Sequence, residues 1–285
     1  MQLAVVGTRS GMPEPGEPSS GYVVRTADTA ILLDCGPGVA GALPAITAPA
    51  DLDAVFLSHL HLDHCHDVLP VAKKIVAPYV PYPGYPGTQQ QTGTPVQVPL
   101  FVSPGGKQAL LTLQRLFPTV SAPMLDRAIE LAFDITEYDA RTGAVIGDCA
   151  VTAFPVPHAV PAWGVRVESP SGILAYTGDT GWSEDLVELA KGADLLLCEA
   201  TRREPDRGPH GHLSATQAGQ LARLAGVGEL ILTHFSTCEP AWLRDLQSDA
   251  SLAFGGPVQL AAPGSVFEVA GRELKPAMKK EVQIP

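Results

Sequence analysis

The feature that most constrains this chain is a cluster of four candidate metal ligands placed directly after a short apolar segment. That segment, Asp53–Leu57, predicts a buried strand. Alternate residues of an extended chain share a face, so His59 and His61 can point the same way. If a helix begins near Asp63, then Asp63 and His64 project into the same hollow. The stretch therefore predicts a metal site with room for two ions, because a solvated loop would leave crowded imidazoles without partners.

The same arrangement recurs downstream, where apolar segments predicted as strands end at His158, Asp179 and His234. His158 lies on stiff backbone between prolines. Asp179 lies among small residues, and its two oxygens can bridge two cations. The alternatives are a structural histidine at 158 and an aspartate that caps the helix predicted over 183–191. Recurrence at strand exits favours the metal interpretation, so we expect these side chains to join the early cluster.

Composition and charge exclude several classes of function. The chain has 285 residues, of which 45% are apolar, as in soluble globular proteins. Its net charge of −11 disfavours broad nucleic-acid binding, although bound cations would still attract a small anion. The five cysteines form no C-x-x-C pair, which predicts free thiols in a reducing compartment. The chain opens on a predicted strand over 2–7 and holds no membrane-length apolar run, so we expect a cytoplasmic protein with no membrane partner.

The rest of the chain predicts one domain over residues 1–270 and a tail over 271–285. A Pro-, Tyr- and Gln-rich insertion over 76–99 is interpreted either as a lid or substrate arm or as a variable loop. Asp34, before a glycine turn, is expected to cap backbone N–H groups. Further strands are predicted over 22–25, 30–34, 101–103, 129–138, 144–146, 149–156, 163–168, 172–176, 194–198 and 229–234, with two short strands up to 269, and helices over 68–75, 105–117, 183–191 and 214–225.

The pattern H-x-H-x-D-H, together with the downstream histidines and aspartate, resembles the metallo-β-lactamase superfamily of binuclear metal hydrolases over nearly the whole chain. The resemblance implies an α/β (α+β layered) fold, an αββα sandwich of two mixed sheets flanked by helices. It implies that His59, His61 and His158 hold one ion, that Asp63, His64 and His234 hold the second, and that Asp179 bridges them. No cysteine stands at the bridging position, which separates this chain from the lactam-cleaving enzymes.

Other motifs resemble the phosphodiesterase branch of that superfamily. The stretches similar to ribonuclease Z are Tyr176–Thr180, Glu199–Thr201, Gly211–Ser214 and Leu232–Ser236. Ser19–Tyr22, Ser58–Cys65 and Leu197–Ala200 look more like a bacterial subgroup of cyclic-nucleotide phosphodiesterases. The insertion over 76–99 is aromatic and uncharged rather than a basic, glycine-rich arm that grips tRNA, which disfavours a nucleic-acid substrate without excluding one.

The chemistry implied is hydrolysis of a small anionic phosphodiester, with a 3′,5′-cyclic nucleotide such as cyclic AMP as the first expectation. Two divalent ions, Zn²⁺ first and Mn²⁺ or Fe²⁺ as alternatives, would hold the hydroxide that attacks phosphorus. Asp63 would orient that hydroxide. His212, oriented by Glu199, would protonate the leaving oxygen as general acid, unless it simply caps the following helix.

Other interpretations stay open at this point. They are a ribonuclease Z-like endonuclease for tRNA 3′ ends, a lactone or thioester hydrolase, and a metal-bearing binding protein. His210, Arg202, Arg203 and Arg207 are candidates for phosphate contacts, whereas Cys65, His66 and Asp67 are interpreted as structural. An exposed apolar edge would support a homodimer, and the sequence leaves the oligomeric state open.

Overall fold

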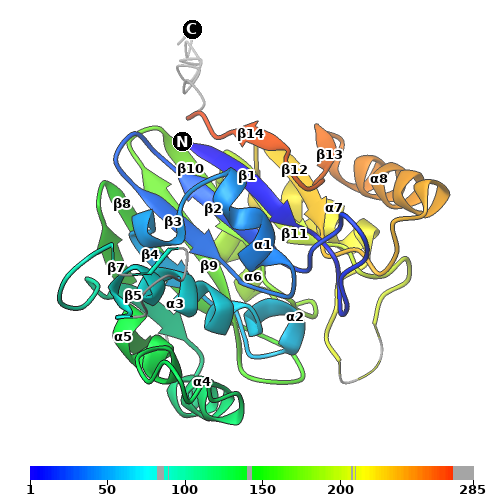
Figure 1. Ribbon diagram of the computed structural model, residues 1–285. Helices are drawn as coiled ribbons and strands as arrows, with labels where there is room; N and C mark the ends of the chain where they lie inside the picture. Colours follow the sequence, from blue (N-terminus) through cyan, green and yellow to red (C-terminus); the bar gives the residue numbers. More distant parts are fainter. Residues whose placement is uncertain (82–86, 89, 140–142, 207, 209, 272–285) are drawn as a thin grey trace, which may run out of the picture.

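The computed structural model describes residues 1–81, 87–88, 90–139, 143–206, 208 and 210–271. Within these residues the chain forms two sheets that face each other, with helices on both outer sides (Figure 1). The expectation of an αββα sandwich of two mixed sheets is confirmed. Among the described residues, none of the helices combines the length and the apolar character needed to cross a bilayer.

The first sheet has the strand order β14-β1-β2-β3-β4-β5-β6. Its strands are β1 (Gln2–Gly7), β2 (Gly21–Arg25), β3 (Ala30–Leu33), β4 (Ala54–Phe56), β5 (Val98–Val102), β6 (Phe133–Glu137) and β14 (Val266–Glu268). Strands β14 to β3 are antiparallel neighbours, and β3 to β6 are parallel neighbours.

The prediction of a strand over 129–138 is wrong for its first residues. Ala128–Ala132 form the short helix α5, and β6 begins only at Phe133. Alanine, leucine and glutamate favour helix, and Ala128, Ile129 and Ala132 bury one helical face.

The second sheet mirrors the first in its pairing pattern. Its order is β13-β12-β11-β10-β9-β8-β7, with parallel pairs from β13 to β10 and antiparallel pairs from β10 to β7. The strands are β7 (Gly143–Ile146), β8 (Cys149–Val156), β9 (Ala162–Ser169), β10 (Gly172–Tyr176), β11 (Leu195–Glu199), β12 (Glu229–Thr233) and β13 (Val258–Leu260).

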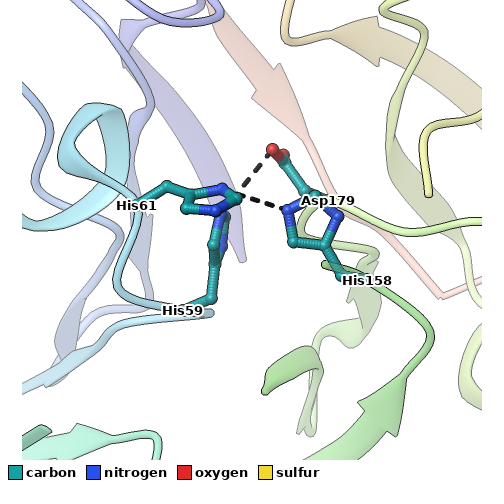
Figure 2. A group of neighbouring side chains, drawn as sticks. All are labelled: His59, His61, His158 and Asp179. Atoms are coloured by element: carbon teal, nitrogen blue, oxygen red, sulfur yellow. Dashed lines mark hydrogen bonds and ion pairs between the residues drawn. The ribbon is translucent and has the colours of Figure 1, made fainter. Parts of the chain in front are cut away.

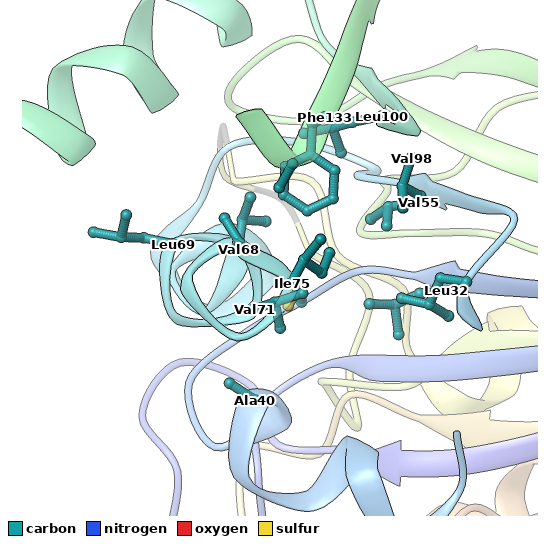
Figure 3. Packing of buried hydrophobic residues seen from close by; sticks show 14 of the residues in the cluster. Leu32, Ala40, Val55, Val68, Leu69, Val71, Ile75, Val98, Leu100 and Phe133 are labelled. Atoms are coloured by element: carbon teal, nitrogen blue, oxygen red, sulfur yellow. The ribbon is translucent and has the colours of Figure 1, made fainter. Parts of the chain in front are cut away.

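Alternation along the strands divides the buried side chains into layers. Ile31 and Leu33 of β3 face the second sheet, whereas Leu32 faces the outer helices. Figure 3 shows that outer layer, in which Val68, Val71 and Ile75 pack toward the sheet. The helices on this side include α1 (Val39–Ala42), α2 (Leu62–Cys65), α3 (Val68–Val76), α4 (Gly106–Leu116) and α5 (Ala128–Ala132).

The other outer layer contains α6 (Asp185–Ala190), α7 (Ala215–Ala225) and α8 (Pro240–Phe254). Helix α7 begins as predicted at Ser214, whose side chain and Gln217 form a capping box. Helix α8 was not predicted from the sequence. It packs closely on α7, because Gly219 carries no side chain toward Ala250 and Ala253.

The parallel pairing of strands determines where the candidate ligands lie. The carboxyl ends of parallel strands meet at one edge of a sheet, and here β3, β4, β10, β11 and β12 all lead into the polar loops that carry the candidate ligands. The insertion over 76–99 joins β5 at its amino end, Val98, which is the end away from those loops. Residues 82–86 and 89 of the insertion, and residues 272–285 of the tail predicted over 271–285, lie outside the described residues.

We expect the substitution Gly219→Ala to lower the free energy of unfolding by about 1–3 kcal/mol, because the added methyl group would overlap the carbonyl oxygen of Ala250. The matched control is Gly41→Ala at an exposed position of α1, where an added Cβ meets open space and stability should be unchanged or higher by about 0.5 kcal/mol. Urea unfolding of both variants measures this difference, and equal stabilities would contradict the tight α7–α8 contact.

Candidate metal centre

The first group of candidate ligands comes from three separate loops and converges on one point. His59, His61, His158 and Asp179 present ligand atoms that all lie within 4.8 Å of one another (Figure 2). Nδ1 of His61 lies 3.1 Å from Nε2 of His158, and Nε2 of His59 lies 3.8 Å from Oδ2 of Asp179. His59 and Asp179 are buried, whereas His61 and His158 are half-buried at the opening.

The second group lies directly beside the first. Nε2 of His234 lies 3.2 Å from Nε2 of His64 and 3.3 Å from Oδ2 of Asp63. Oδ1 of Asp179 lies 3.3 Å from Nε2 of His64, and its Oδ2 lies 3.3 Å from Nε2 of His234. Asp179 therefore stands between the two groups, and all seven side chains selected from the sequence lie in one hollow.

Most of these imidazoles are held by a hydrogen bond at Nδ1, which leaves Nε2 directed into the hollow. A partner at one ring nitrogen fixes the orientation and the tautomer that the other nitrogen presents to a metal. The pairs are His59 with Ser58 Oγ (3.0 Å), His64 with Asp34 Oδ2 (2.8 Å), His158 with the carbonyl oxygen of Gly211 (3.0 Å) and His234 with Thr201 Oγ1 (2.8 Å).

Asp34 has a larger role than the backbone cap that the sequence predicted. It does accept a hydrogen bond from the backbone N–H of Ser58, at 2.6 Å. It also accepts hydrogen bonds from the Ser58 hydroxyl, from Nδ1 of His64 and from the Tyr176 hydroxyl. Its position before a glycine turn was the only sequence signal, and that signal does not distinguish a backbone cap from a histidine partner.

The donor set fits divalent cations. Among the described residues, Nε2 of His59 is buried and has no hydrogen-bond partner, which is costly unless a ligand engages it. Burial and the neighbouring imidazole of His64 hold the pKa of His59 well below its usual range, so its Nε2 is free to bind a metal. Burial opposes ionisation of Asp179, but His234 and His64 outweigh burial and hold its pKa well below the usual range.

The carboxylates around His64 favour its protonated form in the metal-free protein. Burial lowers the pKa of His64, but the carboxylates of Asp179 and Asp34 outweigh burial and raise that pKa well above its usual value. A metal ligand must present a bare nitrogen, so metal binding at this group displaces a proton.

A histidine–carboxylate pair lies beside the two ligand groups. Nδ1 of His212 lies 3.1 Å from both carboxylate oxygens of Glu199 and 4.0 Å from Oδ2 of Asp179. Burial lowers the pKa of His212, but the hydrogen bond and charge of Glu199 outweigh burial and raise it to about 9. His212 therefore holds a proton at neutral pH, and it lies close to the Asp179 carboxylate.

The remaining residues selected from the sequence were candidates for phosphate contacts or for structural roles, and the structure shows the surroundings of most of them. Arg203 forms an ion pair with Asp245 at 2.9 Å and lies over the Trp242 ring, so its charge is already engaged by α8. Asp67 accepts backbone hydrogen bonds from Gly38 and Ala40, in keeping with a structural role. Cys65 is buried, and His66 and His210 are exposed or half-exposed. Arg207 lies outside the described residues.

We expect Asp34→Asn to weaken metal binding by about 10- to 100-fold, because the loss of the carboxylate removes the charge that holds Nδ1–H of His64. Competition with a chromophoric chelator measures the affinity. The control Asp148→Asn alters a carboxylate that also accepts hydroxyl hydrogen bonds, from Thr26 and Thr29, but belongs to neither ligand group. Unchanged metal affinity in Asp34→Asn would show that His64 needs no anchoring.

Known proteins share this chain's length and its fold. The chain is 35% identical over 282 residues to an uncharacterized protein of Mycobacterium leprae, covering 96% of this chain and 90% of that protein. It is 25% identical to the ribonuclease Z of Mycobacterium bovis, covering 91% and 95% of the two chains. The crystal structure of the metallo-beta-lactamase fold protein YhfI from Bacillus subtilis matches with a TM-score of 0.75 at 26% identity, covering 94% of this chain and 99% of that chain.

A family model described as a beta-lactamase superfamily domain matches residues 29–235. That range contains both groups of candidate ligands and the His212–Glu199 pair. The chain therefore belongs to the beta-lactamase superfamily and is a metallo-hydrolase of that family, with a His/Asp cluster that fits a metal site.

Proposed function

We propose that the protein is a binuclear metal-dependent phosphodiesterase that hydrolyses 3′,5′-cyclic nucleotides, with cyclic AMP as the first candidate. The observation that carries the proposal is the His212–Glu199 pair, an imidazole with a raised pKa that lies 4.0 Å from Asp179, the carboxylate between the two ligand groups. Hydrolysis of a cyclic nucleotide expels a ribose alkoxide, which is a poor leaving group without a proton. A proton donor held beside a paired metal site suits that reaction.

The metal assignment is part of the proposal. His59, His61 and His158 would hold one cation, Asp63, His64 and His234 the other, and Asp179 both. Imidazole and carboxylate ligands suit Zn²⁺ best, and Mn²⁺ or Fe²⁺ are the alternatives. When bound, the pair of cations would polarise the phosphate and acidify a water molecule.

The protein side chains divide the remaining tasks. Asp63 accepts a hydrogen bond from the backbone N–H of Gly11 and lies 3.3 Å from Nε2 of His234, so its carboxylate is positioned at the edge of the second group and can orient the attacking water. Glu199 holds Nδ1–H of His212, which leaves Nε2 as the nitrogen that delivers the proton to the leaving oxygen. A histidine that only capped α7 would be redundant, because Ser214 already caps that helix.

A small substrate is favoured over a nucleic acid. The net charge of −11 repels a polyanion at long range, and Arg203 is already paired with Asp245 and Asp249. A tRNA 3′-processing endonuclease is the second candidate function, supported by the 25% identity to a ribonuclease Z over most of both chains. A lactone or thioester hydrolase on the same centre is the third.

A panel of substrates tests the proposal on protein reconstituted with Zn²⁺ or Mn²⁺. We expect turnover of cyclic AMP, of cyclic GMP and of bis(p-nitrophenyl) phosphate, and none of an acyl lactone. Activity should depend weakly on salt, because a mononucleotide displaces few counterions. Cleavage of precursor tRNA with a steep loss at higher salt would instead establish the second candidate. Turnover of the lactone alone would establish the third.

We expect His212→Ala to reduce cyclic-nucleotide turnover by about 10²- to 10⁴-fold while metal content is kept. The turnover of bis(p-nitrophenyl) phosphate should fall far less, because p-nitrophenolate is a good leaving group that needs no proton. The control His66→Ala removes a histidine that is half-exposed and pairs with Asp67, and it should leave both rates unchanged. Equal losses on the two substrates in His212→Ala would remove the general-acid role.

Cyclic-nucleotide turnover should also fall at alkaline pH. His212 is the donor only while it is protonated, so the rate should decline as pH rises through its pKa, which is about 9 in the metal-free protein. Bound cations repel the imidazolium and move this decline below pH 9. A pH profile of kcat for each substrate measures the effect, and the decline should be absent in His212→Ala and with the p-nitrophenyl ester.

A further inference from the structure

We infer that Thr201 is a positioning residue whose hydroxyl couples the second ligand group to the proton-donating pair. This inference rests on the metal-binding part of the proposed function and does not depend on which ester is the substrate. Thr201 follows β11 by two residues, and its side chain reaches two groups that are otherwise separate.

The contacts define a chain of hydrogen bonds. Oγ1 of Thr201 lies 2.8 Å from Nδ1 of His234 and 2.6 Å from Oε2 of Glu199. Glu199 in turn lies 3.1 Å from Nδ1 of His212. Glu199 is completely buried, so its charge depends on these donors and on the backbone N–H of Thr180, at 2.7 Å.

The proton positions follow from the chemistry of each atom. Nε2 of His234 faces Asp63 and Asp179, so in a metal site that nitrogen must be bare and Nδ1 must carry the hydrogen. Nδ1–H of His234 then donates to the Thr201 oxygen. The single hydroxyl hydrogen of Thr201 also has two acceptors within reach, and it goes to the Glu199 carboxylate, which is closer than the carbonyl oxygen of His234 at 3.1 Å and is charged.

This direction of donation makes the two functions depend on one another. The negative charge of Glu199 pulls the hydroxyl hydrogen away from His234, and that leaves the Thr201 oxygen free to accept Nδ1–H. Loss of the Glu199 charge therefore weakens the orientation of His234 as well as that of His212. Loss of the hydroxyl leaves Glu199 with one donor fewer and removes the acceptor at Nδ1 of His234.

The first measurement uses the metal alone. In chelator competition with Zn²⁺, we expect Thr201→Val to weaken the affinity for the second ion by about 10- to 100-fold and to leave the first ion less affected. Thr201→Ser keeps the hydroxyl and should restore the affinity. Thr29→Val is the matched control, because it removes a buried hydroxyl bonded to a carboxylate, Asp148, outside the ligand groups.

A double-mutant cycle tests the coupling itself. Glu199→Gln and Thr201→Val should each lower the affinity for the ion at the second ligand group. The double variant should bind this ion no more weakly than the weaker of the two single variants, because both substitutions interrupt the same chain of hydrogen bonds. Additive losses would overturn the coupling. The readout is metal affinity, so failure of the cyclic-nucleotide assignment would not affect it.

The ring N–H of His234 gives a second readout in Zn²⁺-loaded protein. Long-range ¹⁵N–¹H spectra should show a slowly exchanging hydrogen on Nδ1 of His234 in the wild type and in Thr201→Ser, and faster exchange of that hydrogen in Thr201→Val. If Thr201→Val fails to fold, Thr201→Ala replaces it in the same measurements. An unchanged His234 signal together with unchanged affinity for the second ion would overturn the inference.

Discussion

A completely buried carboxylate at the end of β3 holds the two sheets and the candidate metal centre in one arrangement. Asp34 accepts four hydrogen bonds from the described residues, two from Ser58, one from His64 and one from Tyr176. A buried charge is stable only when donors compensate for lost water, so none of these donors is dispensable. Ser58 and His64 follow the first sheet and Tyr176 ends a strand of the second, so the packing of the sheets and the orientation of a ligand are set together.

A left-handed backbone conformation occurs at one strand exit in each sheet. Asp34 after β3 and His234 after β12 both adopt φ of 59°, a left-handed conformation that disfavours residues other than glycine. Such a conformation persists where surrounding contacts determine it, and both residues are held by several hydrogen bonds. The strain turns each side chain sharply at the strand exit, so that Asp34 reaches His64 and His234 reaches Asp63.

The sequence was most informative where chemistry and periodicity coincide. The apolar run before Ser58 and the repeated histidines and aspartates at strand exits were sufficient to select the seven side chains that lie together. The sequence was least informative about partners. Asp34 and Thr201 carry common side chains in ordinary turn-like contexts, and only the packing of distant strands reveals which imidazole each one holds.

Errors in secondary structure have a similar origin. The sequence predicts a strand where α5 lies, because this helix has only five residues, which are too few to show a helical period of apolar residues. Arg203 was a candidate for phosphate, and nothing local indicates that two acids on α8 engage it, since α8 itself was not predicted. The local sequence pattern thus predicts whether a segment is a helix or a strand and which face is buried. The role of an individual side chain depends on contacts with residues far away in the sequence.

The carboxyl and amino ends of the parallel strands lie at opposite edges of the sandwich, and these edges differ in how well they tolerate changes in loop length. At the carboxyl ends of β3, β4, β10, β11 and β12 the connections carry a candidate ligand or a residue bonded to one, which constrains the length of each of these loops. At the amino ends the connections only return the chain to the sheet, as the segment entering β5 at Val98 does. Insertions, deletions and appended modules can therefore accumulate during evolution on one edge of the sandwich while the opposite edge keeps its spacing.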